Sequence, residues 1–348
     1  MSVPFPDLRN RDLTVAVVGA TGAVGEVLLD ILAKRDFPIG ELRPLASGRS
    51  AGSKVAFRGE QVEVAEAKPE AFEGADLVFF AATGGLSKTL APEAAKRGAI
   101  AIDKSSTWRM DPTVPLVVPE INADALDGHQ GIVSCPNCTT IGFVMALEPL
   151  RRAAGLKEVV VTTLQAVSGA GRDGIDELEA QQAALAGGGT PEASIFAAPI
   201  ANNVVPLCEN FRDDAFSTEE VKLLFETRKI LSEPDLSVTM TCVRVPVPVG
   251  HAASVLVETE HVLAPEAARA ALAEFPGVEV VDDPDARVFP TPADVVGRDE
   301  VLVGRVRKDL ESDRLWLWQV SDNLRKGAAT NAVQIAEALR LRPPVVRR

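Results

Sequence analysis

A buried strand followed by a turn with three evenly spaced glycines is the feature that most restricts the fold of this chain. Residues 13–18 read LTVAVV, a continuous apolar run, and the next stretch is Gly19-Ala-Thr-Gly22-Ala-Val-Gly25. Apolar residues then recur at the spacing of one helix face. The three glycines permit a tight turn, a close approach of the backbone to a pyrophosphate and close helix packing, with the anion at the helix N-terminus. The pattern predicts dinucleotide binding, and its flanking strand and helix favour this over a plain tight turn.

The order of the remaining segments predicts two different sheets. Further apolar runs lie at residues 42–46, 62–65, 75–82, 99–102 and 131–134, and helix-compatible segments such as 87–97 separate several of them. Such alternation is typical of a doubly wound parallel sheet of the Rossmann type. Long β-rich runs follow at residues 156–167, 238–247, 253–262, 300–306 and 314–320. They predict an α+β second domain built on a largely antiparallel sheet.

Length and composition suit two domains. Of the 348 residues, 46% are hydrophobic. We expect residues 1–136 to form the first domain, completed by a C-terminal helix within 326–348, and residues 137–325 to form the second. The short Gly-rich stretch at 187–191 is interpreted as a mobile surface loop.

The net charge of −13 disfavours nucleic acid and anionic membranes as partners, and we expect neither. Four cysteines, no signal-like N-terminus and no long uncharged apolar run favour a reducing compartment, the cytoplasm. No metal site is expected.

The loop after the second predicted strand indicates which nicotinamide cofactor is used. An NAD site usually offers a carboxylate there for the ribose 2′-hydroxyl. The loop contains Ser47, Arg49 and Ser50, and Glu41 stands at the wrong end of the strand. A guanidinium and two hydroxyls suit a 2′-phosphate, so the sequence favours NADP. The alternative is that Arg49 is a solvated loop residue.

Cys138 is the strongest candidate for chemistry. It separates a short apolar run from a helix-like stretch that starts near residue 141. Backbone N–H groups and the dipole at a helix start favour thiolate, the nucleophilic form of cysteine. Cys135 and Cys138 also have the C-x-x-C spacing of thiol-disulfide oxidoreductases, a second functional class. We favour Cys135, like Cys208 and Cys242, as a small buried hydrophobe, although a reversible disulfide between Cys135 and Cys138 stays open.

The order and spacing of several motifs resemble aspartate-semialdehyde dehydrogenase over nearly the whole chain. The resemblance implies NADP-dependent interconversion of L-aspartate 4-semialdehyde plus phosphate with L-4-aspartyl phosphate, on the route to lysine, threonine and methionine. It also implies a homodimer formed through the second domain. The matching stretches, besides the glycine turn, are Ser47-Gly-Arg-Ser-Ala-Gly52, Ser105-Ser-Thr-Trp-Arg109, Pro136-Asn-Cys-Thr-Thr140, Gln165-Ala-Val-Ser-Gly-Ala-Gly171, Thr218-Glu-Glu-Val-Lys222, residues 244–251 and Ser321-Asp-Asn-Leu-Arg-Lys-Gly-Ala-Ala329.

The same resemblance implies roles for single residues. Cys138 is the nucleophile, His251 the base that takes a proton from a thiohemiacetal hydroxyl, and Gln165 the residue that orients the acyl group. From the sequence alone each of the three histidines is more often structural, and the resemblance reverses this for His251 only. The implied cofactor contacts are Gly19, Thr21, Gly22, Ala23, Val24, Gly25, Ser47, Arg49, Ser50, Ser168, Gly169 and Asn323. A helix cap at residues 321–323 is the alternative explanation for Asn323.

Substrate contacts follow from the three charged groups of the substrate. The planar fork of Arg244 suits the α-carboxylate. Glu219 is implied as the contact for the ammonium group, and Lys222 and Arg109 as contacts for phosphate, with Asn137 beside them. An ordinary surface pair three residues apart on a helix is the alternative for Glu219 and Lys222.

Two other functions stay open. Another acyl-phosphate reductase, such as N-acetyl-γ-glutamyl-phosphate reductase, would share the cofactor fold and the thiol chemistry but would not need Glu219 to hold a free ammonium. A non-catalytic NADP-binding sensor would have no use for Cys138, Gln165 and His251.

Overall fold

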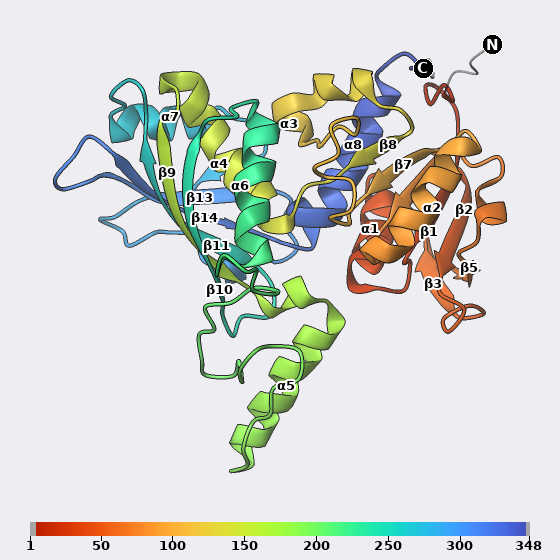
Figure 1. Cartoon of the computed structure of the whole chain (residues 1–348), viewed down its shortest axis with the longest axis horizontal. Helices are drawn as coiled ribbons and strands as arrows, with labels where there is room; N and C mark the ends of the chain where they lie inside the picture. The colour runs from red at the N-terminus through yellow and green to blue at the C-terminus, as the bar shows by residue number, and fades with distance from the viewer. Residues whose placement is uncertain (1–4, 346–348) are drawn as a thin grey trace. The chain divides into compact units, whose positions relative to one another are not determined.

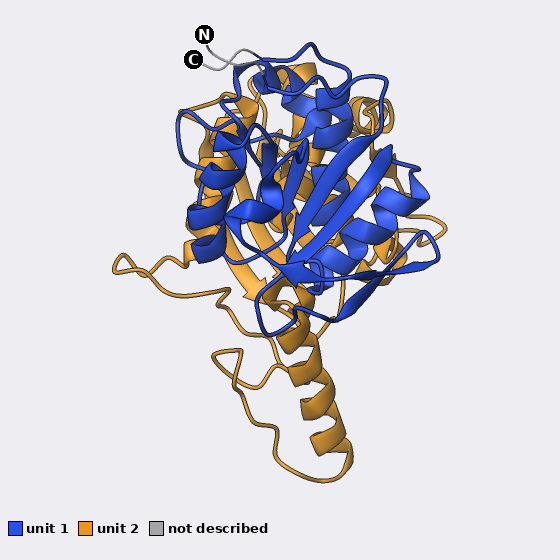
Figure 2. Cartoon of the chain, turned by 90° about the vertical axis from the view of Figure 1, so that its right-hand side faces the viewer, with its two compact units in different colours: residues 1–137, 328–348 blue, residues 138–327 orange. Residues whose placement is uncertain are grey.

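The computed structural model describes residues 5–345, and the chain forms two compact units. Unit 1 contains residues 1–137 and 328–348, and unit 2 contains residues 138–327 (Figure 2). No helix within the described residues is both long and apolar enough to cross a membrane.

Unit 1 is built on a six-stranded parallel sheet with the order β5-β2-β1-β6-β7-β8 (Figure 1). Every neighbouring pair in this sheet is parallel, which confirms the predicted Rossmann-type fold. The central strands are apolar on both faces because helices cover the sheet. The strands are β1 (Leu13–Val18), β2 (Ile39–Ala46), β5 (Ala65–Glu66), β6 (Leu77–Phe80), β7 (Ile100–Asp103) and β8 (Ile132–Ser134).

The helices of unit 1 come from both ends of the chain. Helix α1 (Ala23–Lys34) packs against α8 (Thr330–Arg340), which also contacts β7, whereas α2 (Gly84–Lys96) contacts β6 and β7. The predicted C-terminal helix is therefore present, and a π-helical turn, η5 (Arg325–Ala329), precedes it. Short helical turns complete the unit: η1 (Pro69–Phe72), α3 (Pro119–Asn122) and η2 (Ala123–Gly128).

The expectation of one parallel strand at residues 62–65 was wrong. Strand β4 (Glu60–Glu63) pairs antiparallel with β3 (Lys54–Phe57) in a separate hairpin. Its two-residue loop, Arg58 and Gly59, has positive φ at both positions, the conformation that closes a tight hairpin. Only β5 joins the parallel sheet, at its edge.

Unit 2 is built on a mixed six-stranded sheet with the order β10-β9-β11-β14-β13-β12. The three central pairings are antiparallel, as predicted, and the two outer ones, β10 with β9 and β12 with β13, are parallel. The strands are β9 (Glu158–Gln165), β10 (Ser237–Arg244), β11 (His251–Glu258), β12 (Val278–Val280), β13 (Val301–Lys308) and β14 (Leu315–Ser321). Helix α4 (Cys138–Ala154) packs against β14. Helices α6 (Thr218–Leu231) and α7 (Pro265–Ala273) both pack against α4. Two short 3-10 turns, η3 (Val167–Ala170) and η4 (Pro292–Val295), follow β9 and precede β13.

Helix α5 (Arg172–Ala186) is an element that the sequence pattern did not predict. It projects away from the sheet of unit 2 (Figure 1). Its buried face carries Glu177 and Gln181, which accept hydrogen bonds from the backbone of the following loop, including Ser194 N and Ile200 N. Because polar side chains fill that face, the helix lacks the apolar periodicity by which helices are recognised. The Gly-rich stretch that we interpreted as a loop begins where this helix ends, at Gly187.

Candidate active site

Cys138 is the first residue of α4. The first backbone N–H groups of a helix have no partner within the helix, so they and the helix dipole favour a thiolate at this position. The thiol is partly exposed, whereas the three other cysteines are buried. Burial raises the pKa of the Cys208 thiol to about 12 and raises the pKa of the Cys242 thiol further above its usual value. Cys138 is therefore the cysteine suited to nucleophilic chemistry.

His251 lies beside the thiol. It is the first residue of β11, and its Nε2 is 3.3 Å from Cys138 Sγ. The other ring nitrogen, Nδ1, accepts a hydrogen bond of 3.0 Å from the backbone N–H of Ala166. Burial, and secondly the charge of Arg244, hold the pKa of His251 well below its usual value. Both causes disfavour the charged imidazolium form of this ring.

The two other histidines lie away from any such group. His129 is buried in unit 1, where its Nδ1 accepts a hydrogen bond from Gly131 N and its ring packs at a tilt of 47° against the ring of Phe5. Burial lowers the pKa of His129 to about 4. His261 is exposed after β11, and its carbonyl accepts a hydrogen bond from Thr259. Both have ordinary structural environments.

The sheet of unit 2 explains how distant residues meet. Strands β9 and β10 are parallel, and the residues that end them, Gln165 and Arg244, are direct partners in the register. Strand β11 runs antiparallel to β9, with Ala252 opposite Leu164, so His251 starts where the other two strands end. One edge of the sheet thus presents Gln165, Arg244 and His251 together.

Arg244 is a buried cation with an incomplete set of partners. Its side chain is 5% exposed, its Nη1 donates to Ala166 O over 2.7 Å, and its Cζ lies 5.9 Å from the ring centre of Phe196. Its Nε is buried without a hydrogen-bond partner. A buried unpartnered donor in a native structure needs an explanation, and a bound carboxylate would supply the acceptor.

Gly169 leaves the space that a ligand needs. A Cβ atom at this position would lie 2.6 Å from Arg244 Nη1 and 3.3 Å from His251 Nε2. Gly169 belongs to the η3 turn, as does Ser168. Any side chain at residue 169 would fill the region between the guanidinium and the imidazole, so this glycine is required by close approach rather than by its backbone conformation.

A buried polar network supports that turn. Asn323 Oδ1 accepts hydrogen bonds from Gly250 N, over 2.9 Å, and from Ser168 Oγ. The network joins the η3 turn to the residue before His251. A helix cap was the alternative explanation for Asn323. The capping side chain is that of its neighbour Asp322, whose Oδ1 accepts hydrogen bonds from the backbone N–H groups of Leu324 and Arg325. The cofactor roles of Ser168, Gly169 and Asn323 stay predictions.

Glu219 and Lys222 form the expected pair on α6, but the pair is not an ordinary surface pair. Their charged groups are 3.5 Å apart, and Glu219 is only 4% exposed. Glu219 accepts a hydrogen bond from Thr139, the residue after Cys138, which places its carboxylate near the start of α4. Lys222 also forms an ion pair with Glu209.

The glycine turn of unit 1 has the geometry that a dinucleotide site requires. Gly19 has φ +85°, and a Cβ atom on Gly25 would lie 2.1 Å from Gly19 O, so the fold itself demands these two glycines. A Cβ atom on Gly22 would meet only Gly19 O, at 3.4 Å. Packing thus tolerates a side chain at Gly22, the position assigned to the approach of pyrophosphate. Thr21 precedes it, and Ala23 and Val24 begin α1.

The loop after β2 is more mixed in charge than the sequence suggested. Ser47 and Arg49 are exposed, and Ser50 N donates to Ser47 O in a turn. Glu41 is paired with Arg43, as its distant place on the strand implied. A carboxylate that we did not foresee lies close by, because a Cβ atom on Gly48 would be 3.3 Å from Glu66 Oε1. Glu66 is itself ion-paired with Lys68.

Arg109 and Asn137 belong to unit 1, as does Cys135. Arg109 is 7% exposed, and its guanidinium donates to the carbonyl groups of Cys135 and Lys104. It therefore supports the backbone that leads to Cys138. Asn137 is also buried. Their roles toward phosphate stay predictions.

The sulfur of Cys135 points into the interior of unit 1. It is fully buried and accepts a hydrogen bond of 3.3 Å from Asn331 Nδ2. All four cysteines are free thiols. This environment supports the interpretation of Cys135 as a buried hydrophobe. Within residues 5–345, no group of three His, Cys, Asp or Glu side chains is arranged to hold a metal ion.

Sequence reasoning missed three groups that contact the side chains around Cys138. They are the backbone N–H of Ala166, the ring of Phe196 and the carboxylate of Glu209. A backbone donor leaves no trace in the residue type, and the other two stand in a long loop without periodicity. No signal in the sequence identifies them.

Comparisons with known proteins agree with this geometry. Residues 14–129 match the family model for the NAD-binding domain of semialdehyde dehydrogenase, and residues 147–326 match the model for its dimerisation domain. The chain is 49% identical to aspartate-semialdehyde dehydrogenase from Bacillus subtilis strain 168, covering 95% of this chain and 98% of the relative. Its identity to the Aquifex aeolicus strain VF5 enzyme of the same name is 48%, covering 93% and 97%.

Solved structures give the same result. A structure of aspartate semialdehyde dehydrogenase II from Vibrio cholerae, described as complexed with ASA, has a TM-score of 0.92 and 44% identity, covering 95% of this chain and 98% of that one. A Candida albicans aspartate semialdehyde dehydrogenase, described as with NADP, has a TM-score of 0.74 and 26% identity, covering 94% and 98%. The matched domain model implies a nicotinamide dinucleotide as cofactor.

Proposed function

Because the chain belongs to the aspartate-semialdehyde dehydrogenase family, we propose that it reduces L-4-aspartyl phosphate to L-aspartate 4-semialdehyde and phosphate, with NADPH, through a thioester on Cys138. The membership predicted from the sequence motifs is confirmed by the family models and the relatives, and it argues against a C-x-x-C redox protein or a cofactor sensor. The observation that carries the mechanism is the thiol at the start of α4, 3.3 Å from His251 Nε2.

The residues of unit 2 fit the steps of this reaction. The Cys138 thiolate forms a bond to the acyl carbon, and phosphate leaves with the electron pair of the broken carbon–oxygen bond. When bound, NADPH supplies the hydride that reduces the thioester. His251, whose Nε2 is 3.3 Å from the Cys138 sulfur, is assigned to the oxygen of the reacting carbon, and Gln165, at the end of β9, is assigned to orient the acyl group.

Charge complementarity supports the choice of substrate. The unpartnered Nε of Arg244 suits the α-carboxylate of an aspartyl group. The buried Glu219 carboxylate near Thr139 suits its ammonium group. Lys222, Arg109 and Asn137 are the residues that we assign to phosphate.

The cofactor is proposed to be NADP rather than NAD. The contacts with its pyrophosphate are assigned to the glycine turn, where Gly22 offers backbone without a side chain. Arg49 and Ser47 are exposed and Ser50 is partly exposed, and together their side chains suit the 2′-phosphate. Glu66 stands nearby, but its charge is offset by Lys68.

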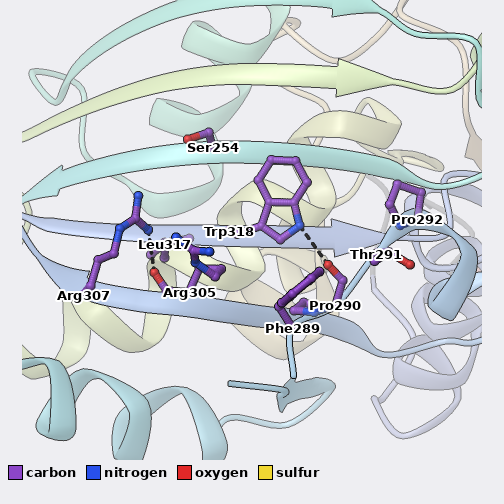
Figure 3. Close-up of a pocket in the computed structure, with 9 residues that line it drawn as sticks. All are labelled: Ser254, Phe289, Pro290, Thr291, Pro292, Arg305, Arg307, Leu317 and Trp318. Atoms are coloured by element: carbon purple, nitrogen blue, oxygen red, sulfur yellow. Dashed lines mark hydrogen bonds between the residues drawn. The ribbon is translucent and has the colours of Figure 1, made fainter. Parts of the chain in front are cut away.

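We further propose that the protein is a homodimer of the cytoplasm. A groove on β13, β14 and the preceding loop is lined by Phe289, Pro290, Arg305, Arg307 and Trp318 (Figure 3). Phe289 is 47% exposed, which suits an apolar contact with a second copy. The match of this region to a dimerisation domain supports that occupant. Four free cysteines suit a reducing compartment.

The nearest alternative is reduction of another acyl phosphate, such as N-acetyl-γ-glutamyl phosphate. That substrate has no free ammonium group, so the buried Glu219 carboxylate would find no cationic group on it to bind. A contact between Glu219 and a substrate ammonium group is therefore the feature that favours the aspartyl substrate.

A spectrophotometric assay tests the proposal. The purified full chain, given L-aspartate 4-semialdehyde, phosphate and NADP, should produce reduced nicotinamide, whereas N-acetyl-glutamate semialdehyde should give far slower turnover. NAD in place of NADP should raise the KM for cofactor. Absence of turnover with the aspartate aldehyde, while a relative from Bacillus subtilis works in the same mixture, would refute the proposed function.

A further inference from the structure

Glu220 is a buried carboxylate on the first turn of α6, next to Glu219. It is 9% exposed and accepts hydrogen bonds from two backbone groups. Its Oε2 accepts from Ser217 N over 2.7 Å, and its Oε1 accepts from Cys242 N over 3.0 Å. The first bond belongs to the capping box of α6, in which Ser217 Oγ accepts from Glu220 N. The second bond leaves the helix and reaches strand β10.

The bond to Cys242 covers the outer edge of the unit 2 sheet. Strand β10 is the last strand on its side of the sheet, so alternate N–H groups of β10 point away from β9. The N–H of Arg244 is one of them, because it donates to Val205 O of a loop. Cys242 lies two residues earlier on the strand and therefore has the same outward orientation. The Glu220 carboxylate thus accepts a hydrogen bond that a further strand would otherwise accept.

The two elements that Glu220 joins carry different parts of the proposed substrate site. Helix α6 carries Glu219, which we assign to the substrate ammonium group, and Lys222, which we assign to phosphate. Strand β10 ends in Arg244, which we assign to the α-carboxylate. The ammonium and α-carboxylate groups of an aspartyl substrate are bonded to the same carbon atom. The side chains that bind them must therefore keep one fixed separation, and the bond from Cys242 N to Glu220 links the elements that carry them.

We propose that Glu220 is a positioning residue that fixes the separation between Glu219 and Arg244 and thereby sets the affinity for the α-amino acid end of the substrate. This inference deepens the proposed function and rests on it. Glu220 itself takes no part in the chemistry, because its two carboxylate oxygens accept hydrogen bonds from the backbone. Selection of an α-amino acid substrate then depends on a carboxylate that the substrate does not contact.

Two substitutions of Glu220 in the full chain test this role by kinetics. Glu220→Met keeps the length and the helix preference of the side chain but removes both acceptor oxygens. We expect the KM for aspartate semialdehyde to rise by about tenfold or more, while kcat falls by less than about threefold and the KM for NADP stays within about twofold. Glu220→Gln keeps one acceptor oxygen and should raise the same KM by about threefold or more. A KM within about twofold of wild type in both variants, or a fall in kcat alone, would overturn the proposal.

Two control variants separate positioning from a general loss of stability. Ser217→Ala removes the side-chain half of the capping box but keeps both backbone bonds to Glu220. Asp76→Asn alters a carboxylate of unit 1 that is also 9% exposed and accepts a hydrogen bond from Thr14 N. Both controls should lower the midpoint of thermal unfolding by about 2–6 °C and leave the KM for aspartate semialdehyde unchanged. A rise of this KM in either control as large as that in Glu220→Met would overturn the proposal, because KM would then follow stability.

Amide hydrogen exchange examines the contact without any turnover. The Cys242 amide should exchange slowly in the wild type and in Ser217→Ala, because it is bonded to Glu220. In Glu220→Met we expect its exchange to become about tenfold faster or more. Equal exchange at Cys242 in the wild type and in Glu220→Met would overturn the proposal and leave the proposed function intact. If the wild-type chain does not turn over aspartate semialdehyde, the proposed function fails, but the exchange at Cys242 still reports whether Glu220 holds β10.

Discussion

The glycine turn of unit 1 and the thiol cluster of unit 2 are encoded in different ways. The turn is contiguous, and each glycine from Gly19 to Gly25 has a local reason in the geometry of strand, turn and helix. The cluster joins Cys138 to His251, 113 residues away, through the register of three strands. A local site can be inferred from spacing, whereas an assembled site depends on a sheet whose register is known only from the structure.

Substitution of the nucleophile should have the largest effect. We expect Cys138→Ser to lower kcat by a factor of about 10³ or more, because an alcohol at a helix start is not ionised at neutral pH. Steady-state rates with aspartate semialdehyde measure this. Cys135→Ala is the matched control and should retain turnover, since its sulfur points into unit 1. Equal loss in both variants would instead favour a functional pair of cysteines.

Arg244→Lys should be the next largest change. A buried bidentate contact with a carboxylate is worth about 1.5–3 kcal/mol, so we expect the KM for aspartate semialdehyde to rise by about ten- to a hundredfold. The lysine keeps the charge but loses the fork. Arg212→Lys, at an exposed arginine that pairs with Asp214, is the control and should leave KM unchanged. An unaltered KM in Arg244→Lys would remove Arg244 from the substrate site.

Two neighbouring glycines should separate fold from function in unit 1. Gly25→Ala places a methyl group 2.1 Å from Gly19 O, so we expect it to destabilise the protein by about 1–3 kcal/mol in denaturant unfolding. Gly22→Ala meets no atom closer than 3.4 Å and should leave unfolding nearly unchanged. It should still weaken NADP binding by about tenfold in titration calorimetry, because the backbone can no longer approach the pyrophosphate. Normal NADP affinity in Gly22→Ala would place the cofactor elsewhere.

Arg49→Ala should have the smallest effect of the four. The side chain is exposed, so its attraction for a 2′-phosphate is partly screened by salt. We expect the preference for NADP over NAD, measured as a ratio of kcat/KM values, to fall by about tenfold or less, and the fall to shrink at high salt. A preference that does not change would shift the selection of cofactor to other residues of the loop.

The parts of the molecule that the sequence predicted are those that follow from local periodicity. The parallel sheet, β1, and the helices α1 and α8 follow from apolar runs and helix faces. Helix α5 escaped because Glu177 and Gln181 fill its buried face. The hairpin of β3 and β4 escaped because its turn depends on the left-handed conformation of Arg58, which the residue type does not indicate.

The candidate site divides in the same way. Helix-start geometry indicates that the Cys138 thiol is reactive, without any alignment. His251, Gln165 and Arg244 entered through a family resemblance, since a lone strand-end residue has no distinguishing pattern. The structure adds the Ala166 N–H and the unpartnered Arg244 Nε, which are properties of backbone position and burial.

Single turnover without phosphate tests the central claim most directly. The enzyme mixed with L-aspartate 4-semialdehyde and NADP alone should release a burst of about one equivalent of reduced cofactor per active chain and then stop. Mass spectrometry should locate the aspartyl adduct on Cys138, and added phosphate should discharge it. A reduced cofactor signal without any adduct on that peptide, or an adduct on another residue, would contradict a thioester mechanism at Cys138.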